Sequence, residues 1–117
     1  MATEDDARRI ALSLPATTER PSYGTPGFRV KDKLFARVHD LPHTLVVWVP
    51  DMAEKEALLA AAPQTYFETP HYDGYPMVLV RLPAIEVGEL TEVLTDSWRA
   101  RAPRRLLAEF ESRHPPP

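Results

Sequence analysis

Residues 67–76, Phe-Glu-Thr-Pro-His-Tyr-Asp-Gly-Tyr-Pro, combine polar, aromatic and turn-forming side chains directly before an apolar strand at residues 77–82. A segment of this kind holds polar groups at the edge of a sheet. A histidine titrates near neutral pH, so His71 or Asp73 is a candidate to contact a ligand or to act as acid or base. The structural alternative is that both side chains hydrogen-bond the loop backbone while the neighbouring tyrosines cover the sheet edge.

A second loop, Tyr23-Gly24-Thr25-Pro26, is the candidate opposite wall of a pocket with the His71 loop. The same stretch equally fits a loop whose glycine and proline serve only the backbone. The side chains that we expect around such a pocket are Tyr23, Thr25, His71, Tyr72, Asp73 and Arg81.

Basic residues are concentrated in two segments of a chain whose net charge is -3. Residues 20–40 carry five bases against two acids, and residues 99–113 carry five arginines against two glutamates. Side chains of this type contact phosphates. Alternatively, the first segment is a solvated sheet face or an edge protected from strand pairing. The second follows a helix end, whose dipole favours positive charge. The candidate phosphate contacts are Arg29, Lys31, Lys33, Arg37, Arg101, Arg104 and Arg105.

Several classes of function lack their signatures in this chain. There is no cysteine, hence no disulfide framework and no thiolate metal site. Phosphate-binding, dinucleotide-binding and nucleophile-elbow motifs are absent from the sequence, and the histidines match no recognised metal-ligand spacing. We therefore expect no catalytic residues, no metal and no cofactor. No apolar run approaches the roughly 20 residues that span a bilayer, and the acidic first residues are unlike a signal peptide. These features predict a cytoplasmic protein that has no membrane partner.

The pattern of apolar residues predicts helices alternating with strands. Residues 15–27 contain three prolines and two glycines and are expected to be a loop. Leu34, Ala36 and Val38 should alternate with Phe35, Arg37 and His39 across a strand. A tight turn is expected at Asp32-Lys33. Helices are predicted at 3–14, 51–62, 86–100 and from 103 onward, and strands at 28–31, 34–39, 44–49, 66–68 and 77–82.

This order predicts a single α+β domain over residues 1–113, followed by a disordered proline tail at 114–117. The sheet should be antiparallel, with the helices packed mainly on one face. The other face would then be open, and Arg29, Lys31, Arg37 and Arg81 are the side chains expected there. Trp48 is predicted to belong to the core, although a place on the open face would make it a stacking surface for a base.

The chain resembles the MmcQ/YjbR family over roughly residues 5–105. The resemblance implies a helix, three strands, helix, two strands, helix fold, akin to secretion chaperones and CyaY-like proteins. It also implies the family's label of DNA-binding protein with a double-wing arrangement. The hairpin turn differs, because family members often place glycines where this chain has Lys31-Asp32-Lys33. The resemblance lies in residues 16–19, 22–30, 33–36, 67–76, 78–82 and 96–99.

Two functions therefore compete at the level of sequence. The first is a non-enzymatic DNA-binding protein that uses its basic hairpin with support from the C-terminal arginines. The second is a module that binds a small ligand or a protein between the Tyr23 and His71 loops. A homodimer formed through an open sheet face or edge is compatible with either.

Overall fold

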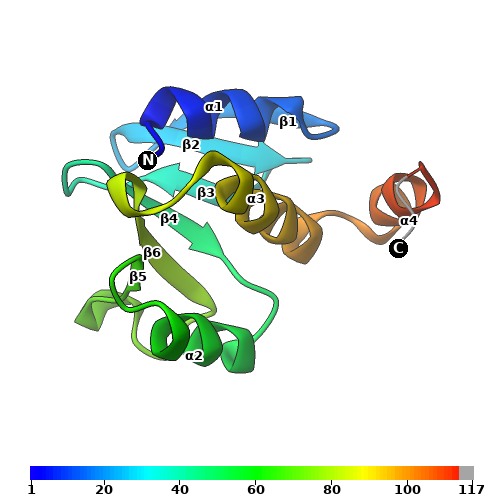
Figure 1. Cartoon of the computed structure of the whole chain (residues 1–117). Helices are drawn as coiled ribbons and strands as arrows, with labels where there is room; N and C mark the ends of the chain where they lie inside the picture. Colours follow the sequence, from blue (N-terminus) through cyan, green and yellow to red (C-terminus); the bar gives the residue numbers. More distant parts are fainter. Residues whose placement is uncertain (114–117) are drawn as a thin grey trace.

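The computed structural model describes residues 1–113 as an antiparallel six-stranded sheet flanked by helices (Figure 1). The strand order is β1-β2-β3-β4-β6-β5. The proline tail predicted at 114–117 lies outside the described residues. No helix of residues 1–113 is long and apolar enough to cross a membrane. The elements are α1 (Glu4–Ser13), β1 (Thr17–Ser22), β2 (Thr25–Val30), β3 (Lys33–Val38), β4 (Thr44–Trp48), α2 (Met52–Ala61), β5 (Tyr66–Phe67), η1 (Pro70–Tyr72), β6 (Met77–Arg81), η2 (Leu82–Ala84), α3 (Val87–Arg101) and α4 (Arg104–Arg113).

Helices α1 and α3 pack against each other and against strands β1 to β4, while α2 lies beside β5 (Figure 1). The main core is formed where these helices meet one face of the sheet. Helix α3 contributes Leu90, Leu94 and Trp98 to it, all fully buried. The sheet contributes Phe28, Val30, Ala36, Val38, Leu45, Val47, Val78 and Val80. The predicted α+β class, with an antiparallel sheet in a single domain, is confirmed.

The prediction of a loop at residues 15–27 is wrong, because this segment forms the edge strand β1 and the start of β2. The two strands pair along their whole length, with Pro21 opposite Pro26. Pro21 is tolerated because one side of the edge strand β1 needs no backbone donor, and Pro26 precedes the register of β2 with β3, which starts at Gly27. The turn between them consists of Tyr23 and Gly24, whose φ angles of 55° and 81° are both positive, as in the tight turns that suit hairpins.

The next hairpin turns one residue earlier than the sequence predicts, at Lys31-Asp32, where φ is 47° and 70°. Strand β3 also contains a bulge, because Phe28 pairs with Ala36 whereas the next residue, Arg29, pairs with Leu34. The extra residue, Phe35, shifts the alternation, so Phe35 and Ala36 are both buried in the main core. The expected alternation of residues 34–39 is therefore wrong before Ala36. Leu34 consequently lines the same cavity as Arg37.

The sheet face opposite α1 and α3, which we call the open face, is partly covered by the chain itself. Arg37, Val46, Leu79 and Phe67 lie in one row across strands β3, β4, β6 and β5. Val46 and Leu79 are buried beneath Tyr72, which comes from the loop that precedes β6. This loop over the open face creates a second, smaller apolar cluster and one wall of a cavity.

Gly27 is the tightest point of the strand pairing. A Cβ added there would lie 2.9 Å from Ser22 Cβ, 3.0 Å from the Arg20 carbonyl oxygen and 3.1 Å from Leu34 Cδ1. Because β2 is paired on both sides, its backbone cannot move away. We expect Gly27→Ala to lower the free energy of unfolding by about 1–3 kcal/mol in urea titrations.

The matched control is Gly88→Ala in the first turn of α3, where an added Cβ meets nothing within 4 Å. This change should leave the free energy of unfolding unchanged or raise it by up to about 1 kcal/mol. Equal destabilisation by the two substitutions would contradict the close approach of β1, β2 and β3 at Gly27.

Candidate functional site

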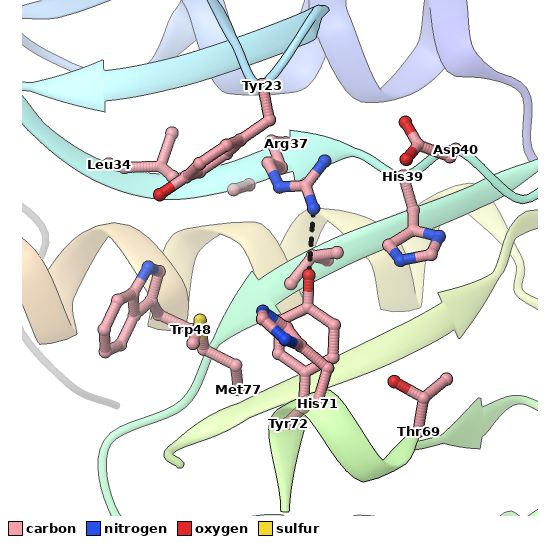
Figure 2. A pocket seen from close by; sticks show the side chains of 12 residues that line it. Tyr23, Leu34, Arg37, His39, Asp40, Trp48, Thr69, His71, Tyr72 and Met77 are labelled. Carbon is pink, nitrogen blue, oxygen red and sulfur yellow. Dashed lines mark hydrogen bonds between the residues drawn. The ribbon is translucent and has the colours of Figure 1, made fainter.

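A cavity of about 490 Å³ opens on the open face between the two loops singled out by the sequence (Figure 2). Strands β3 and β4 form its floor, the Tyr23 turn forms one wall and the loop around η1 forms the other. Its lining residues are Tyr23, Leu34, Ala36, Arg37, His39, Asp40, Val46, Trp48, Thr69, His71, Tyr72 and Met77.

Of the six residues expected around a pocket, Tyr23, His71 and Tyr72 line this cavity. Thr25 is half-buried behind it and holds Arg37 through its hydroxyl group. Asp73 is exposed and is not part of the lining. Arg81 lies elsewhere, because its guanidinium stacks 4.1 Å from the centre of the Phe67 ring and lines a different surface depression.

Arg37 is the charged group at the centre of the cavity. Its Nη1 donates to Thr25 Oγ1 at 3.2 Å and to the Val38 carbonyl at 3.1 Å, and its Nη2 donates to the Tyr72 hydroxyl at 2.9 Å (Figure 2). The guanidinium also lies 5.3 Å from the centre of the Tyr23 ring. The sequence suggested Arg37 as part of a DNA-binding hairpin, whereas the structure places it in this cavity and links it to both loops.

Tyr72 is the anchor of the loop on the sheet. Only 4% of its surface is exposed, and its ring packs on Val46 and Leu79. The His71 ring stands edge-on to it at 4.8 Å between centres, and the His39 ring approaches it from the sheet at 6.1 Å. The Tyr72 hydroxyl is thereby fixed at the position where it meets Arg37.

Lys55 on α2 fixes the backbone of this loop and was missed at the sequence level. Its ammonium nitrogen donates to the carbonyls of Tyr72 at 2.7 Å and Tyr75 at 2.8 Å, and it lies 2.6 Å from Glu68 Oε2. Lys55 is buried, with 1% of its surface exposed. Each of the three N–H donors of its ammonium group has an acceptor. The sequence did carry a signal, because position 55 begins the i, i+3, i+4, i+7 stripe of α2 that continues through residues 58, 59 and 62.

The loop was expected to be held by the side chains of His71 and Asp73. Within residues 1–113 neither side chain makes a hydrogen bond to the loop backbone, and His71 instead presents its exposed ring to the cavity. The loop closes through its own backbone, where the Tyr72 N–H donates to the Thr69 carbonyl at 2.9 Å and the Tyr75 N–H donates to the Tyr72 carbonyl at 3.1 Å. The side chain of His71 is therefore available to a ligand.

His39 is the titratable group whose pKa the cavity lowers. Burial of the imidazole is the main cause, and the positive charge of Arg37 adds to it, while Asp40 opposes both. Nδ1 of His39 accepts the Leu41 N–H at 3.1 Å, so the hydrogen of the neutral ring sits on Nε2. At neutral pH the histidine is therefore an uncharged donor beside the charged Arg37.

The β2–β3 turn, which belongs to the first basic segment, lies at the same end of the molecule as the second basic segment in α3 and α4 (Figure 1). Nε of Arg101, in the last turn of α3, donates to the Leu34 carbonyl at 3.0 Å, directly beside the β2–β3 turn. The Arg101 guanidinium lies over the Trp48 ring, 4.1 Å from its centre. Trp48 is half-buried at the border of the cavity, so its prediction as a core residue is only partly correct.

The remaining candidate phosphate contacts differ in how freely their charges are presented. Arg29 is half-buried and donates to the Asp32 carbonyl at 3.4 Å. The Asp32 carboxylate pairs with Arg20 at 2.8 Å. The freely exposed cations are Lys31, Lys33, Arg104 and Arg105.

The interpretation of the C-terminal arginines as helix-dipole partners holds only for the end of α3. Arg104 and Arg105 occupy the first turn of α4, where the helix dipole is positive and disfavours a cation. Their clustering there therefore needs another explanation.

Among residues 1–113, no group of three or more His, Asp and Glu side chains is placed to hold a metal ion. What the cavity offers instead is one guanidinium, two imidazoles, one carboxylate and an aromatic wall. These groups suit recognition of an anion or of a planar ring.

The lowered pKa of His39 makes a testable link to Arg37. Arg37→Gln removes the positive charge, so the pKa of His39 measured by NMR titration should rise relative to the wild type. Arg9→Gln, a change of equal charge on the far helix α1, should leave it unchanged. A pKa of His39 that is insensitive to Arg37→Gln would contradict the placement of Arg37 beside it.

The lowered pKa of His39 also sets the direction in which pH changes the stability of the fold. The folded chain binds a proton at His39 less readily than the unfolded chain, whose histidine titrates near 6.5. The contribution of His39 to stability is therefore fully present above pH 6.5, and it is lost as the pH falls through the lowered pKa. In urea titrations, this decrease between neutral and mildly acidic pH should be smaller in His39→Gln than in the wild type. An equal decrease in stability in the wild type and in His39→Gln would contradict the lowered pKa of His39.

Comparison with known proteins shows which sequences and structures this chain is similar to. "Uncharacterized protein Mb2600" of Mycobacterium bovis and "Uncharacterized protein Rv2570" of Mycobacterium tuberculosis are each 39% identical to the chain over 127 residues, covering 94% of this chain and 96% of theirs. The crystal structure of Deinococcus radiodurans protein DR2400, with a DUF419 domain, matches with a TM-score of 0.70 and 26% identity, over 85% of this chain and 78% of that one. The family model named YjbR matches residues 12–100. The chain therefore belongs to the YjbR family.

Proposed function

We propose that this protein is a non-enzymatic DNA-binding protein that contacts the phosphate backbone with one basic end. The basic end consists of Arg29, Lys31, Lys33, Arg101, Arg104 and Arg105. The observation that carries the proposal is the hydrogen bond from Arg101 to the Leu34 carbonyl, which joins two basic segments 67 positions apart in the chain.

The charges at the basic end support this assignment. Lys31 and Lys33 are exposed at the β2–β3 turn, and Arg104 and Arg105 are exposed on the first turn of α4. Within residues 1–113 none of these four side chains forms an ion pair with a carboxylate. Unpaired cations on a chain of net negative charge are suited to displace counterions from a phosphate backbone. The proposal includes a cytoplasmic location.

A second candidate function is favoured by the cavity on the open face. Its volume of about 490 Å³ lies within the usual range of small-molecule sites. Two loops that are far apart in the sequence converge on it, and each contributes an aromatic side chain, Tyr23 and Tyr72. Under this second proposal, the open face binds a small ligand independently of the basic end.

DNA binding is tested by fluorescence anisotropy with a labelled random duplex over a range of salt concentrations. Affinity should fall steeply with salt, and Lys31→Gln/Lys33→Gln should reduce the slope of log K against log[salt] by about two. Arg8→Gln/Arg9→Gln, which removes the same charge from α1, should leave the slope unchanged. Absence of binding at low salt, or equal effects of the two double variants, would refute the proposal.

A further inference from the structure

We infer that the cavity on the open face is a binding site for an aromatic carboxylate, with Arg37 as the counter-charge of the carboxylate group. The inference rests on the second proposed function, that this cavity binds a small ligand, and names the chemical class of that ligand. It is independent of DNA binding at the basic end.

The first argument is the uncompensated charge of Arg37. Its three hydrogen-bond partners are two hydroxyl groups and one backbone carbonyl, all of them neutral. No carboxylate of residues 1–113 forms an ion pair with it. Removing part of a charged group from water costs less free energy when an anion pairs with it. The cavity therefore holds a positive charge whose partner the described chain does not supply.

The second argument is the hydrogen-bonding capacity that Arg37 retains. A guanidinium carries five N–H donors, and three of those of Arg37 are used, two from Nη1 and one from Nη2. The Nε–H and the second Nη2–H remain. Two neighbouring N–H groups of a guanidinium match the two oxygens of a carboxylate.

The third argument is the aromatic wall around this cation. Tyr23 is 85% exposed and stands at the cavity rim on a tight turn with a φ of 55°. Figure 2 shows the Tyr23 ring beside Arg37, with Trp48 and Met77 on the other side of the cavity. A planar ring between them would contact aromatic and apolar surface while its carboxylate meets Arg37.

The remaining charge in the cavity selects a monoanion over a phosphate dianion. Asp40 lines the same cavity, and its carboxylate would repel a second negative charge. His39 contributes no positive charge at neutral pH, since its pKa is lowered. A monoanion can therefore pair with the one guanidinium without placing a second negative charge near Asp40.

The test compares 2-naphthoate with its neutral analogue 2-naphthamide, each titrated into the ¹⁵N-labelled protein and followed by NMR. A charge-assisted pair should make the naphthoate bind at least about tenfold more tightly. Shifts should centre on residues that line the cavity. Equal affinity for both probes would overturn the carboxylate assignment while leaving the cavity as a ligand site. If neither probe shifts any signal, both the carboxylate assignment and the cavity as a ligand site are overturned. DNA binding at the basic end is tested separately, by the anisotropy titration.

Three variants locate the interaction. Arg37→Gln should abolish the preference for naphthoate over naphthamide, bringing the two affinities together. Tyr23→Ala removes an exposed ring without disturbing the core, and it should lower the affinity for both probes several-fold. Tyr75→Ala, which removes an exposed ring outside the cavity, should change neither. A preference for naphthoate that survives Arg37→Gln in the folded protein, or equal effects of the two tyrosine variants, would contradict the inference.

Discussion

The open face owes its form to one buried ammonium group. Lys55 projects from α2 into the loop at residues 67–76, where two carbonyls and Glu68 accept its three donors. A buried cation is stable only when it is paired and fully hydrogen-bonded, so the loop must keep this conformation as long as Lys55 stays buried. That conformation lays Tyr72 on Val46 and Leu79 and brings its hydroxyl to Arg37. One side chain thus supports the covered cluster, the cavity wall and one of the three hydrogen bonds that position Arg37.

The register of β3 divides the basic residues between two surfaces. The bulge at Phe35 turns Leu34 toward the cavity together with Arg37, while the β2–β3 turn carries Lys31 and Lys33 beyond the sheet to the basic end. Arg101 connects these surfaces, because it binds the Leu34 carbonyl and covers the Trp48 ring. A cavity containing a single cation and a separate array of exposed cations can therefore serve different ligands.

Helices and central strands followed from apolar periodicity. The YjbR resemblance rested on segments from most of the chain, among them the two loops whose Tyr23, His71 and Tyr72 line the cavity. Four features did not follow, each for a physical reason. Prolines at 21 and 26 indicated a loop, yet Pro21 lies in the edge strand β1, and Pro26 lies at the start of β2, before its register with β3 begins. The bulge at Phe35 breaks a two-residue period that sequence patterns assume to be continuous. Lys55 was not singled out from the sequence, although it lies on the same stripe of α2 as Leu58, Leu59 and Ala62. The convergence of the basic segments depends on the contact between Arg101 and Leu34, which only the fold reveals.

The most direct measurement is the set of NMR contacts between the Tyr72 ring and the methyl groups of Val46 and Leu79. These contacts are compared in the wild type, in Lys55→Met and in the control Lys33→Met. If Lys55 holds the loop, these contacts disappear in Lys55→Met and the amides of residues 69–76 exchange faster, while the sheet amides stay protected. Lys33→Met should resemble the wild type. Contacts that persist in Lys55→Met would contradict the central role of Lys55, and the cavity would then depend on Tyr72 packing alone.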